Sequence, residues 1–132
     1  MALVLIVDDS KTSRGYCRAI LTSAGHEVME ASDGEQALDR MADRPPDCVV
    51  LDLFMPGLSG LEMMEVLGGR AEPTPIVVLT SSMEETDRVR CMRLGARAFV
   101  TKPVGCDDLL RAVRDALATG GSLFASAGSR AR

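Results

Sequence analysis

The chain has 132 residues, which is enough for one domain with a single buried core. Hydrophobic residues make up 46% and charged residues 26%, so the composition is that of a globular protein and disorder is not expected. The net charge of −4 and the isoelectric point of about 5.0 argue against direct binding to nucleic acid.

The N-terminal apolar segment does not look like a signal peptide, because it has no positive flank and is stopped by Asp8 and Asp9. No stretch approaches the ~18 apolar residues of a membrane span. The four cysteines form no CxxC pair, so we interpret them as reduced cysteines of a cytoplasmic protein rather than as a zinc site. With His26 as the single histidine, a histidine-rich metal cluster is excluded.

In the first part of the chain, short apolar runs alternate with segments that carry helix start and stop signals. Continuous runs of branched residues are typical of parallel strands covered on both faces. Ser and Asp are good N-cap residues, and Gly and Pro end helices. The expected elements are a strand over Ala2–Val7, a helix from Ser10 to about Ala24, a weaker edge strand over Glu27–Ala31 and a helix from Asp33 to just before Pro45.

The same alternation continues in the second part. The last helix is recognised by apolar residues at i, i+4, i+7 and i+8, which is the spacing of one buried helix face. The expected elements are strands over Asp47–Leu51, Ile76–Thr80 and Arg97–Val100, and helices around Leu61, Met64 and Leu67, over Glu84–Leu94, and around Leu109, Val113, Ala116 and Leu117.

Five strand–helix units predict a doubly wound (βα)5 α/β fold, a three-layer sandwich, because parallel strands are joined by right-handed crossovers. After Ala118 the composition shifts to Thr, Gly, Ser, Ala and Arg without periodicity. We therefore expect a single domain over residues 1–119 and a flexible tail over residues 120–132.

Polar residues follow four of the predicted strands at the point where each strand ends. Asp8 and Asp9 follow the first strand, Asp52 the third, Thr80 ends the fourth and Lys102 follows the fifth. Ligands of such sheets bind outside the carboxyl ends of the strands. Each residue alone suits an ordinary turn, cap or surface position, but together they indicate phosphate chemistry with a hard metal ion.

Four segments in this order resemble the receiver domain of two-component response regulators, most closely the stand-alone chemotaxis type. They are residues 5–12 (LIVDDSKT), 50–57 (VLDLFMPG), 78–81 (VLTS) and 95–103 (GARAFVTKP). The resemblance covers the chain from Ala2 to about Ala118. It implies a flavodoxin-like, five-stranded parallel sheet with strand order 2-1-3-4-5.

The resemblance also implies how the strand-end residues act. Asp52 would be the nucleophile that takes a phosphoryl group from a phosphohistidine or a small acyl phosphate. Mg²⁺, or Mn²⁺ in its place, would be held by Asp9, Asp52 and the Phe54 backbone carbonyl, with Asp8 acting largely through water. Lys102 would place a positive charge on a phosphoryl oxygen.

The family further implies a switch. Thr80 would sense the phosphoryl group, the backbone of Phe54 and Ser81 would contact its oxygens, and Phe99 would be the aromatic switch residue. The output surface would be the fourth helix, fifth strand and fifth helix, roughly Glu84–Ala118. Phosphorylation would shift a pre-existing equilibrium between two conformations.

Other positions carry narrower expectations from the same resemblance. The Lys102–Pro103 peptide bond is expected to be cis, and Phe54 and Ser82 are expected to tune the lifetime of the phosphate. Exposed residues of the first helix near Arg14 and Arg18 are expected to set the pairing with a kinase.

The expected partners are a sensor histidine kinase or histidine phosphotransfer protein and a phosphorylation-dependent target, with no nucleic acid and no membrane. The protein would be a monomer or a phosphorylation-induced dimer. Three alternatives remain: a receiver cut from a larger regulator with an output domain, an aspartate-nucleophile phosphatase, and a degenerate receiver that acts as a scaffold. The phosphatase is disfavoured because Phe54 stands where a second acid is needed.

Overall fold

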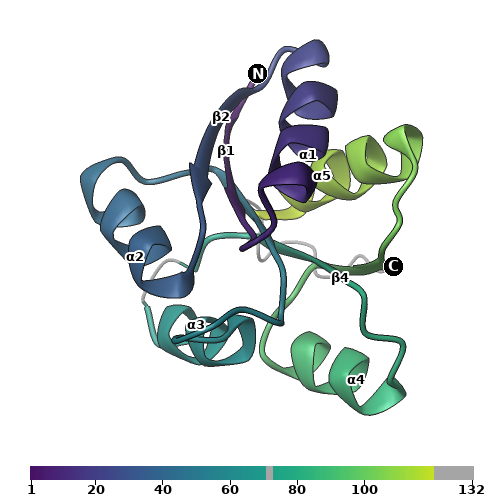
Figure 1. The fold of residues 1–132 in the computed structure, drawn as a ribbon. Coiled ribbons are helices and arrows are strands. Elements are labelled where there is room, and N and C mark those ends of the chain that lie inside the picture. The colour runs from purple at the N-terminus through teal and green to yellow at the C-terminus, as the bar shows by residue number, and fades with distance from the viewer. Residues whose placement is uncertain (71–72, 121–132) are drawn as a thin grey trace.

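The computed structural model describes residues 1–70 and 73–120, which form one parallel sheet with helices on both faces (Figure 1). The sheet has five strands in the order β2-β1-β3-β4-β5, so the predicted fold class is confirmed. In chain order the elements are β1 (Leu3–Val7), α1 (Lys11–Ser23), β2 (Glu27–Ala31), α2 (Gly34–Asp43), β3 (Cys48–Leu51), α3 (Gly60–Gly68), β4 (Ile76–Thr80), α4 (Glu85–Arg93), β5 (Ala98–Thr101) and α5 (Cys106–Gly120).

Two apolar layers hold the helices against the sheet. Side chains of a strand alternate between the two faces, so Leu5 and Val7 of β1 join one layer while Val4 and Ile6 join the other. The layer of Leu5 and Val7 includes residues of α2, α3 and α4, and the other includes residues of α1 and α5. Figure 1 shows this division of the helices between the two sides of the sheet.

The helices begin where the sequence supplies a capping side chain. Ser10 accepts a hydrogen bond from the Ser13 backbone N–H, and Asp33 accepts one from Gln36. α3 begins with a reciprocal capping box between Ser59 and Glu62. α4 lacks such a bond, because the side chain of Glu84 at its N-cap makes no capping bond, and α5 is preceded by Gly105, which has no side chain to offer.

The element boundaries differ from the predicted ones by a few residues. β5 ends at Thr101 rather than Val100, because Thr101 pairs with Thr80 and continues the ladder with β4. α5 runs to Gly120, two residues past Ala118, after which the composition of the sequence changes. The predicted tail lies mostly outside the described residues, and the domain boundary at residue 119 stays a prediction.

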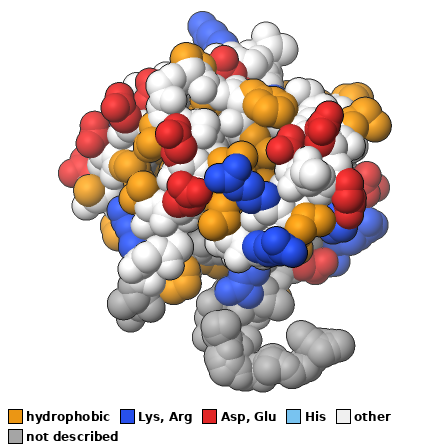
Figure 2. Space-filling model, turned by 90° about the horizontal axis from the view of Figure 1, so that it is seen from below, with side chains coloured by type: hydrophobic (Ala, Val, Ile, Leu, Met, Phe, Trp, Pro, Cys, Tyr) orange, Lys and Arg blue, Asp and Glu red, His pale blue; other side chains and the backbone are white. Residues whose placement is uncertain are grey.

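Charges are mixed on the face shown in Figure 2, where acidic and basic side chains lie next to each other. Among the surface ion pairs of α4, Arg88 pairs with Glu85 and Arg90 pairs with Glu65 of α3. Within the described ranges, no helix combines the length and apolar character that crossing a membrane requires.

Candidate functional site

The sheet order brings the ends of β1 and β3 side by side. Val7 pairs with Leu51 in the parallel register, so the residues that follow them, Asp8 and Asp52, emerge at the same edge. The Asp52 backbone N–H donates to the Val7 carbonyl at 2.9 Å and holds the two strand ends together. At β4 and β5, the Lys102 backbone N–H donates to the Thr80 carbonyl at 2.8 Å.

Three carboxylates gather at this edge. Oxygen atoms of Asp8, Asp9 and Asp52 all lie within 4.8 Å of one another. Asp8 and Asp52 are buried, at 3% and 7% exposure, whereas Asp9 is exposed. The donors are all hard oxygens with one solvent-facing member, which fits Mg²⁺ because that ion prefers oxygen ligands and retains several waters.

Lys102 contributes the positive charge of the site. Its Nζ donates to Asp8 Oδ2 at 2.8 Å and to Asp52 Oδ2 at 3.3 Å. Partial burial by itself lowers the pKa of Lys102, but the hydrogen bond to Asp8 and the charges of Asp52 and Asp8 outweigh it, so the pKa lies above its usual value. The side chain is therefore held as an ammonium between two carboxylates.

Asp52 is also fixed from its own loop. Its Oδ1 accepts from the Phe54 backbone N–H at 3.3 Å, while the Phe54 ring is 54% exposed. Gly60, the first residue of α3, packs directly on this turn, and its N–H donates to the Leu53 carbonyl at 3.1 Å. A Cβ at Gly60 would lie 2.7 Å from Leu53 Cα and closer still to the Asp52 carbonyl oxygen.

The sequence reasoning missed the role of Gly60, although a signal was present. Ser59 and Glu62 form the Ser-x-x-Glu pattern of a capping box, which locates the start of α3. That start lies against the Asp52 backbone. The glycine after the cap is required because the helix approaches the strand end too closely for a side chain.

Thr80 and Ser82 form a chain of hydrogen bonds that leads from β4 to α4. Thr80 is fully buried, and its Oγ1 accepts from the Ser82 backbone N–H at 3.4 Å. The buried Ser82 hydroxyl donates to Asp87 Oδ2 at 2.6 Å and accepts from the Glu84 backbone N–H at 3.2 Å. The Ser82 hydroxyl is thus committed to the first turn of α4, a contact that the sequence did not reveal.

The remaining predicted residues are placed as follows. Phe99 is half-buried and packs against the apolar layer on the α2–α4 side of the sheet. Ser81 is exposed. The Lys102–Pro103 peptide bond is cis, as the resemblance implied.

Arg14 and Arg18 of α1 differ in their exposure. The Arg14 side chain is only 16% exposed and binds Glu30 and the Asp8 backbone carbonyl, while Arg18 is exposed. Arg14 is therefore held mainly within the fold, and the expectation that exposed residues near Arg14 and Arg18 set the pairing with a kinase stays a prediction.

Comparison with known proteins agrees with this architecture. The family model described as the response regulator receiver domain matches residues 4–114. The chain is 38% identical over 120 residues to the protein PilH of Pseudomonas aeruginosa, which covers 89% of this chain and 99% of PilH. It is 38% identical over 117 residues to the transcriptional regulatory protein KdpE of Mycobacterium tuberculosis, which covers 89% of this chain and 51% of KdpE.

Solved structures show the same fold. The chemotaxis protein CheY4 of Vibrio cholerae superposes with a TM-score of 0.79 at 31% identity, over 86% of this chain and 97% of that one. NtrX of Brucella abortus superposes with a TM-score of 0.85 at 32% identity, over 90% of this chain and 27% of that one. The chain thus spans nearly all of PilH and CheY4 but about half of KdpE and about a quarter of NtrX.

Proposed function

Because the chain belongs to the response regulator receiver domain family, we propose that it is a phosphorylation-controlled switch in which Asp52 is the phosphoacceptor. Receiver domains of this family receive phosphate from histidine kinases and act on protein targets in two-component signalling. The resemblance predicted from the sequence motifs, including the likeness to chemotaxis-type receivers, is confirmed by the matches. The observation that carries the assignment of Asp52 is the sharing of Lys102 between Asp52 and Asp8.

The proposed reaction is nucleophilic substitution at phosphorus. An Asp52 carboxylate oxygen forms a bond to the phosphorus of a phosphohistidine, the P–N bond breaks, and its electron pair returns to the imidazole nitrogen. The product is an acyl phosphate on Asp52. The Phe54 backbone N–H, which already contacts Asp52 Oδ1, orients the carboxylate for this attack.

Positive charge is required because a phosphoryl group carries negative charge into an acidic site. When bound, Mg²⁺, or Mn²⁺ in its place, supplies charge that offsets the repulsion between the carboxylates and the phosphoryl oxygens. Asp9, Asp52 and the Phe54 carbonyl would hold the ion, with Asp8 acting largely through water. Lys102 would then contact a phosphoryl oxygen, which is within its reach since its ammonium already lies at Asp52.

We propose that Thr80 reads the phosphorylated state. Its hydroxyl would donate to a phosphoryl oxygen, and the Ser81 backbone N–H would contact the same group. The buried position of Thr80 and its hydrogen bond with the Ser82 N–H tie any movement of this hydroxyl to the loop before α4. Phe99 would turn inward, and the surface of α4, β5 and α5 would change. The coupling free energy between phosphorylation and binding at that surface would be about 1–3 kcal/mol.

The product of this chemistry is an altered protein contact rather than a released substrate. Receiver domains act as phosphoacceptor switches, and we propose that this one catalyses its own phosphotransfer and dephosphorylation. The donor would be a sensor histidine kinase or a histidine phosphotransfer protein in the cytoplasm. The phosphorylated form would bind a protein target or dimerise through α4, β5 and α5.

Two of the alternatives are disfavoured by the site. An aspartate-nucleophile phosphatase needs a second acid two residues after Asp52, where Phe54 stands. A degenerate scaffold would not need the carboxylates of Asp8 and Asp52 assembled around Lys102. A receiver belonging to a larger regulator uses the same chemistry, so the proposal for Asp52 holds for that case too.

The proposal is tested by intact-mass spectrometry after incubation with acetyl phosphate. One phosphoryl group is expected on the wild type with Mg²⁺ and none with EDTA. Asp52→Ala is expected to remain unmodified, whereas Asp107→Asn, an exposed carboxylate at the start of α5, serves as the matched control and should be phosphorylated like the wild type. Hydroxylamine should remove the group, since it cleaves acyl phosphates.

A phosphoryl group that persists in Asp52→Ala would contradict the assignment of the acceptor. An unmodified wild type that also fails to bind beryllofluoride, a stable mimic of the phosphoryl group, would contradict the switch itself. In that case the scaffold would become the better description.

A further inference from the structure

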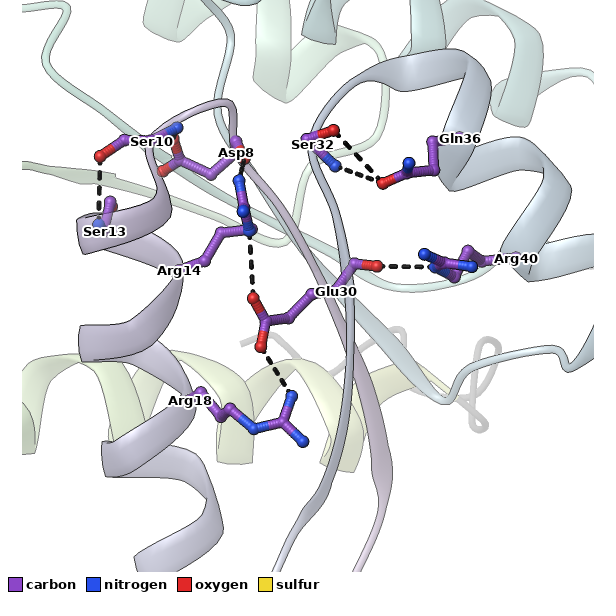
Figure 3. A network of polar contacts seen from close by, with 9 residues as sticks. All are labelled: Asp8, Ser10, Ser13, Arg14, Arg18, Glu30, Ser32, Gln36 and Arg40. Atoms are coloured by element: carbon purple, nitrogen blue, oxygen red, sulfur yellow. Dashed lines mark hydrogen bonds and ion pairs between the residues drawn. The ribbon is translucent and has the colours of Figure 1, made fainter.

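The loop between β1 and α1 carries Asp8 and Asp9. A side chain that has no role in the proposed chemistry, Arg14, donates a hydrogen bond to the backbone of this loop. Arg14, one turn into α1, donates from Nη1 to the Asp8 backbone carbonyl at 2.7 Å and from Nε to Glu30 Oε1 at 3.0 Å (Figure 3). The Arg14 side chain is 16% exposed. This guanidinium therefore connects the acidic loop to β2 at the edge of the sheet.

Glu30 is itself held in place from two sides. Its Oε2 accepts from Arg18 at 2.7 Å, and its backbone carbonyl accepts from Arg40 of α2 at 2.7 Å. Figure 3 shows Glu30 between α1 and α2, with the Arg14 guanidinium between the Glu30 carboxylate and Asp8. Arg14 is thus anchored to a fixed carboxylate through Nε and holds the Asp8 carbonyl through Nη1.

The Asp8 carbonyl is a sensitive point because it belongs to the peptide group that joins Asp8 to Asp9. Other hydrogen bonds hold the backbone N–H and the side chain of Asp8. Its N–H donates to the Ala31 carbonyl at 3.1 Å, and its Oδ1 accepts from the Ser10 N–H at 2.9 Å. The Arg14 bond adds the orientation of the intervening peptide plane. That plane determines how the exposed Asp9 carboxylate stands relative to Asp8 and Asp52.

Arg14 can orient this peptide while adding little repulsion toward a bound cation. An unpaired guanidinium beside the three carboxylates would repel a divalent ion, but Glu30, which Arg14 shares with the exposed Arg18, offsets part of its charge. Arginine suits the task better than lysine, because its planar group donates in two directions at once.

We propose that Arg14 is a positioning residue for the cation site, which acts through the Asp8–Asp9 peptide rather than by contact with the ion. The inference rests on the proposed function, since it takes the carboxylates of Asp8, Asp9 and Asp52 as the cation site. Removing a group that hydrogen-bonds to a metal ligand and orients it typically lowers metal affinity by about tenfold or more.

The test is calorimetric titration of Mg²⁺, with Mn²⁺ as a second probe, into unphosphorylated protein. Arg14→Gln is expected to weaken binding about tenfold. Arg18→Gln is the matched control, because it also loses an ion pair with Glu30 but has no bond to the Asp8 carbonyl. Arg18→Gln should bind Mg²⁺ with an affinity within about twofold of the wild type, because it leaves the bond that orients the Asp8–Asp9 peptide in place.

Circular dichroism on both variants separates positioning from folding. Should Arg14→Gln fail to fold, Arg14→Lys is measured in its place. Lysine keeps the charge, but its single nitrogen cannot hold Glu30 and the Asp8 carbonyl in the two directions that Arg14 uses. Its Mg²⁺ affinity should fall below that of the wild type, by less than the tenfold expected for Arg14→Gln. Wild-type affinity in the folded Arg14 variant, or an equal loss in Arg18→Gln, would overturn the inference. A wild type that binds neither ion would instead overturn the cation site and the proposed function with it.

Discussion

The ammonium of Lys102 lies closer to Asp8 than to Asp52, at 2.8 Å against 3.3 Å. The two partners of the shorter contact are separated by 94 residues of sequence. They also come from β5 and β1, between which β3 and β4 lie in the sheet. The lysine therefore reaches past the ends of β4 and β3 to the end of β1, and its positive charge reduces the repulsion between the two carboxylates.

This relationship predicts a pH dependence of stability without divalent metal. The pKa of Lys102 is raised on folding from its usual 10.5, so its contribution to stability is fully present below pH 10.5 and is lost as the pH rises through the folded-state pKa. Lys102→Met should lower the free energy of unfolding by about 1–3 kcal/mol at pH 8, because two carboxylates lose their donor. Urea denaturation from pH 8 to pH 11.5 should show this deficit narrowing only at the alkaline end.

The matched control is Lys11→Met, since Lys11 is exposed and is the other lysine of the chain. Its effect on stability should be small and should not change with pH in the same range. A deficit for Lys102→Met that already disappears between pH 8 and pH 10 would show that the ammonium is not what stabilises the site.

Ser82 should stabilise α4 through its hydroxyl. Ser82→Ala removes the donor to Asp87 and the acceptor of the Glu84 N–H in a helix whose N-cap side chain makes no capping bond. We expect a loss of about 1–2 kcal/mol and faster amide exchange in the first turn of α4. Ser81→Ala, which changes an exposed serine and keeps its backbone N–H, is the control; equal effects of the two variants would argue against the Ser82–Asp87 link.

Gly60 should tolerate no side chain. Gly60→Ala places a Cβ against the backbone of Leu53 and Asp52, so we expect a loss of about 1–3 kcal/mol in thermal denaturation and slower phosphorylation by acetyl phosphate. Gly68→Ala, in the same helix, meets its nearest atom outside that helix at an ordinary 3.8 Å and should raise stability by about 0.5–1 kcal/mol. If Gly60→Ala were as stable as Gly68→Ala, the close approach of α3 to Asp52 would be refuted.

Phe54 should prolong the lifetime of the phosphorylated state. Phe54 is half-exposed and its backbone N–H contacts Asp52, so we expect its ring to hinder an attacking water. Phe54→Asn should lose phosphate roughly tenfold faster, corresponding to a barrier lower by about 1.4 kcal/mol, measured as decay of the phosphorylated mass after the donor is removed. Val66→Asn, a change at an exposed apolar residue of α3, should decay like the wild type; an unchanged rate in Phe54→Asn would exclude the shielding role.

Much of the fold could be predicted because its signals are local. Apolar runs and capping residues such as Ser10 and Asp33 located the strands and the helix starts to within a few residues. The boundaries that shifted, such as the end of β5 at Thr101, are set by pairing with β4, which no local pattern contains.

The residues at the strand ends were predictable from local pattern alone. Asp8, Asp9, Asp52, Thr80 and Lys102 follow or close apolar runs, and parallel strands must bring those ends to one edge. Which side chains meet at that edge depends on the packing of the folded chain. The bond of Arg14 to the Asp8 carbonyl and the closeness of Gly60 to Asp52 depend on how each helix packs on the sheet. Periodicity states which face of an element is buried, but a contact between side chains requires the relative position of two elements, which arises only when the whole core packs.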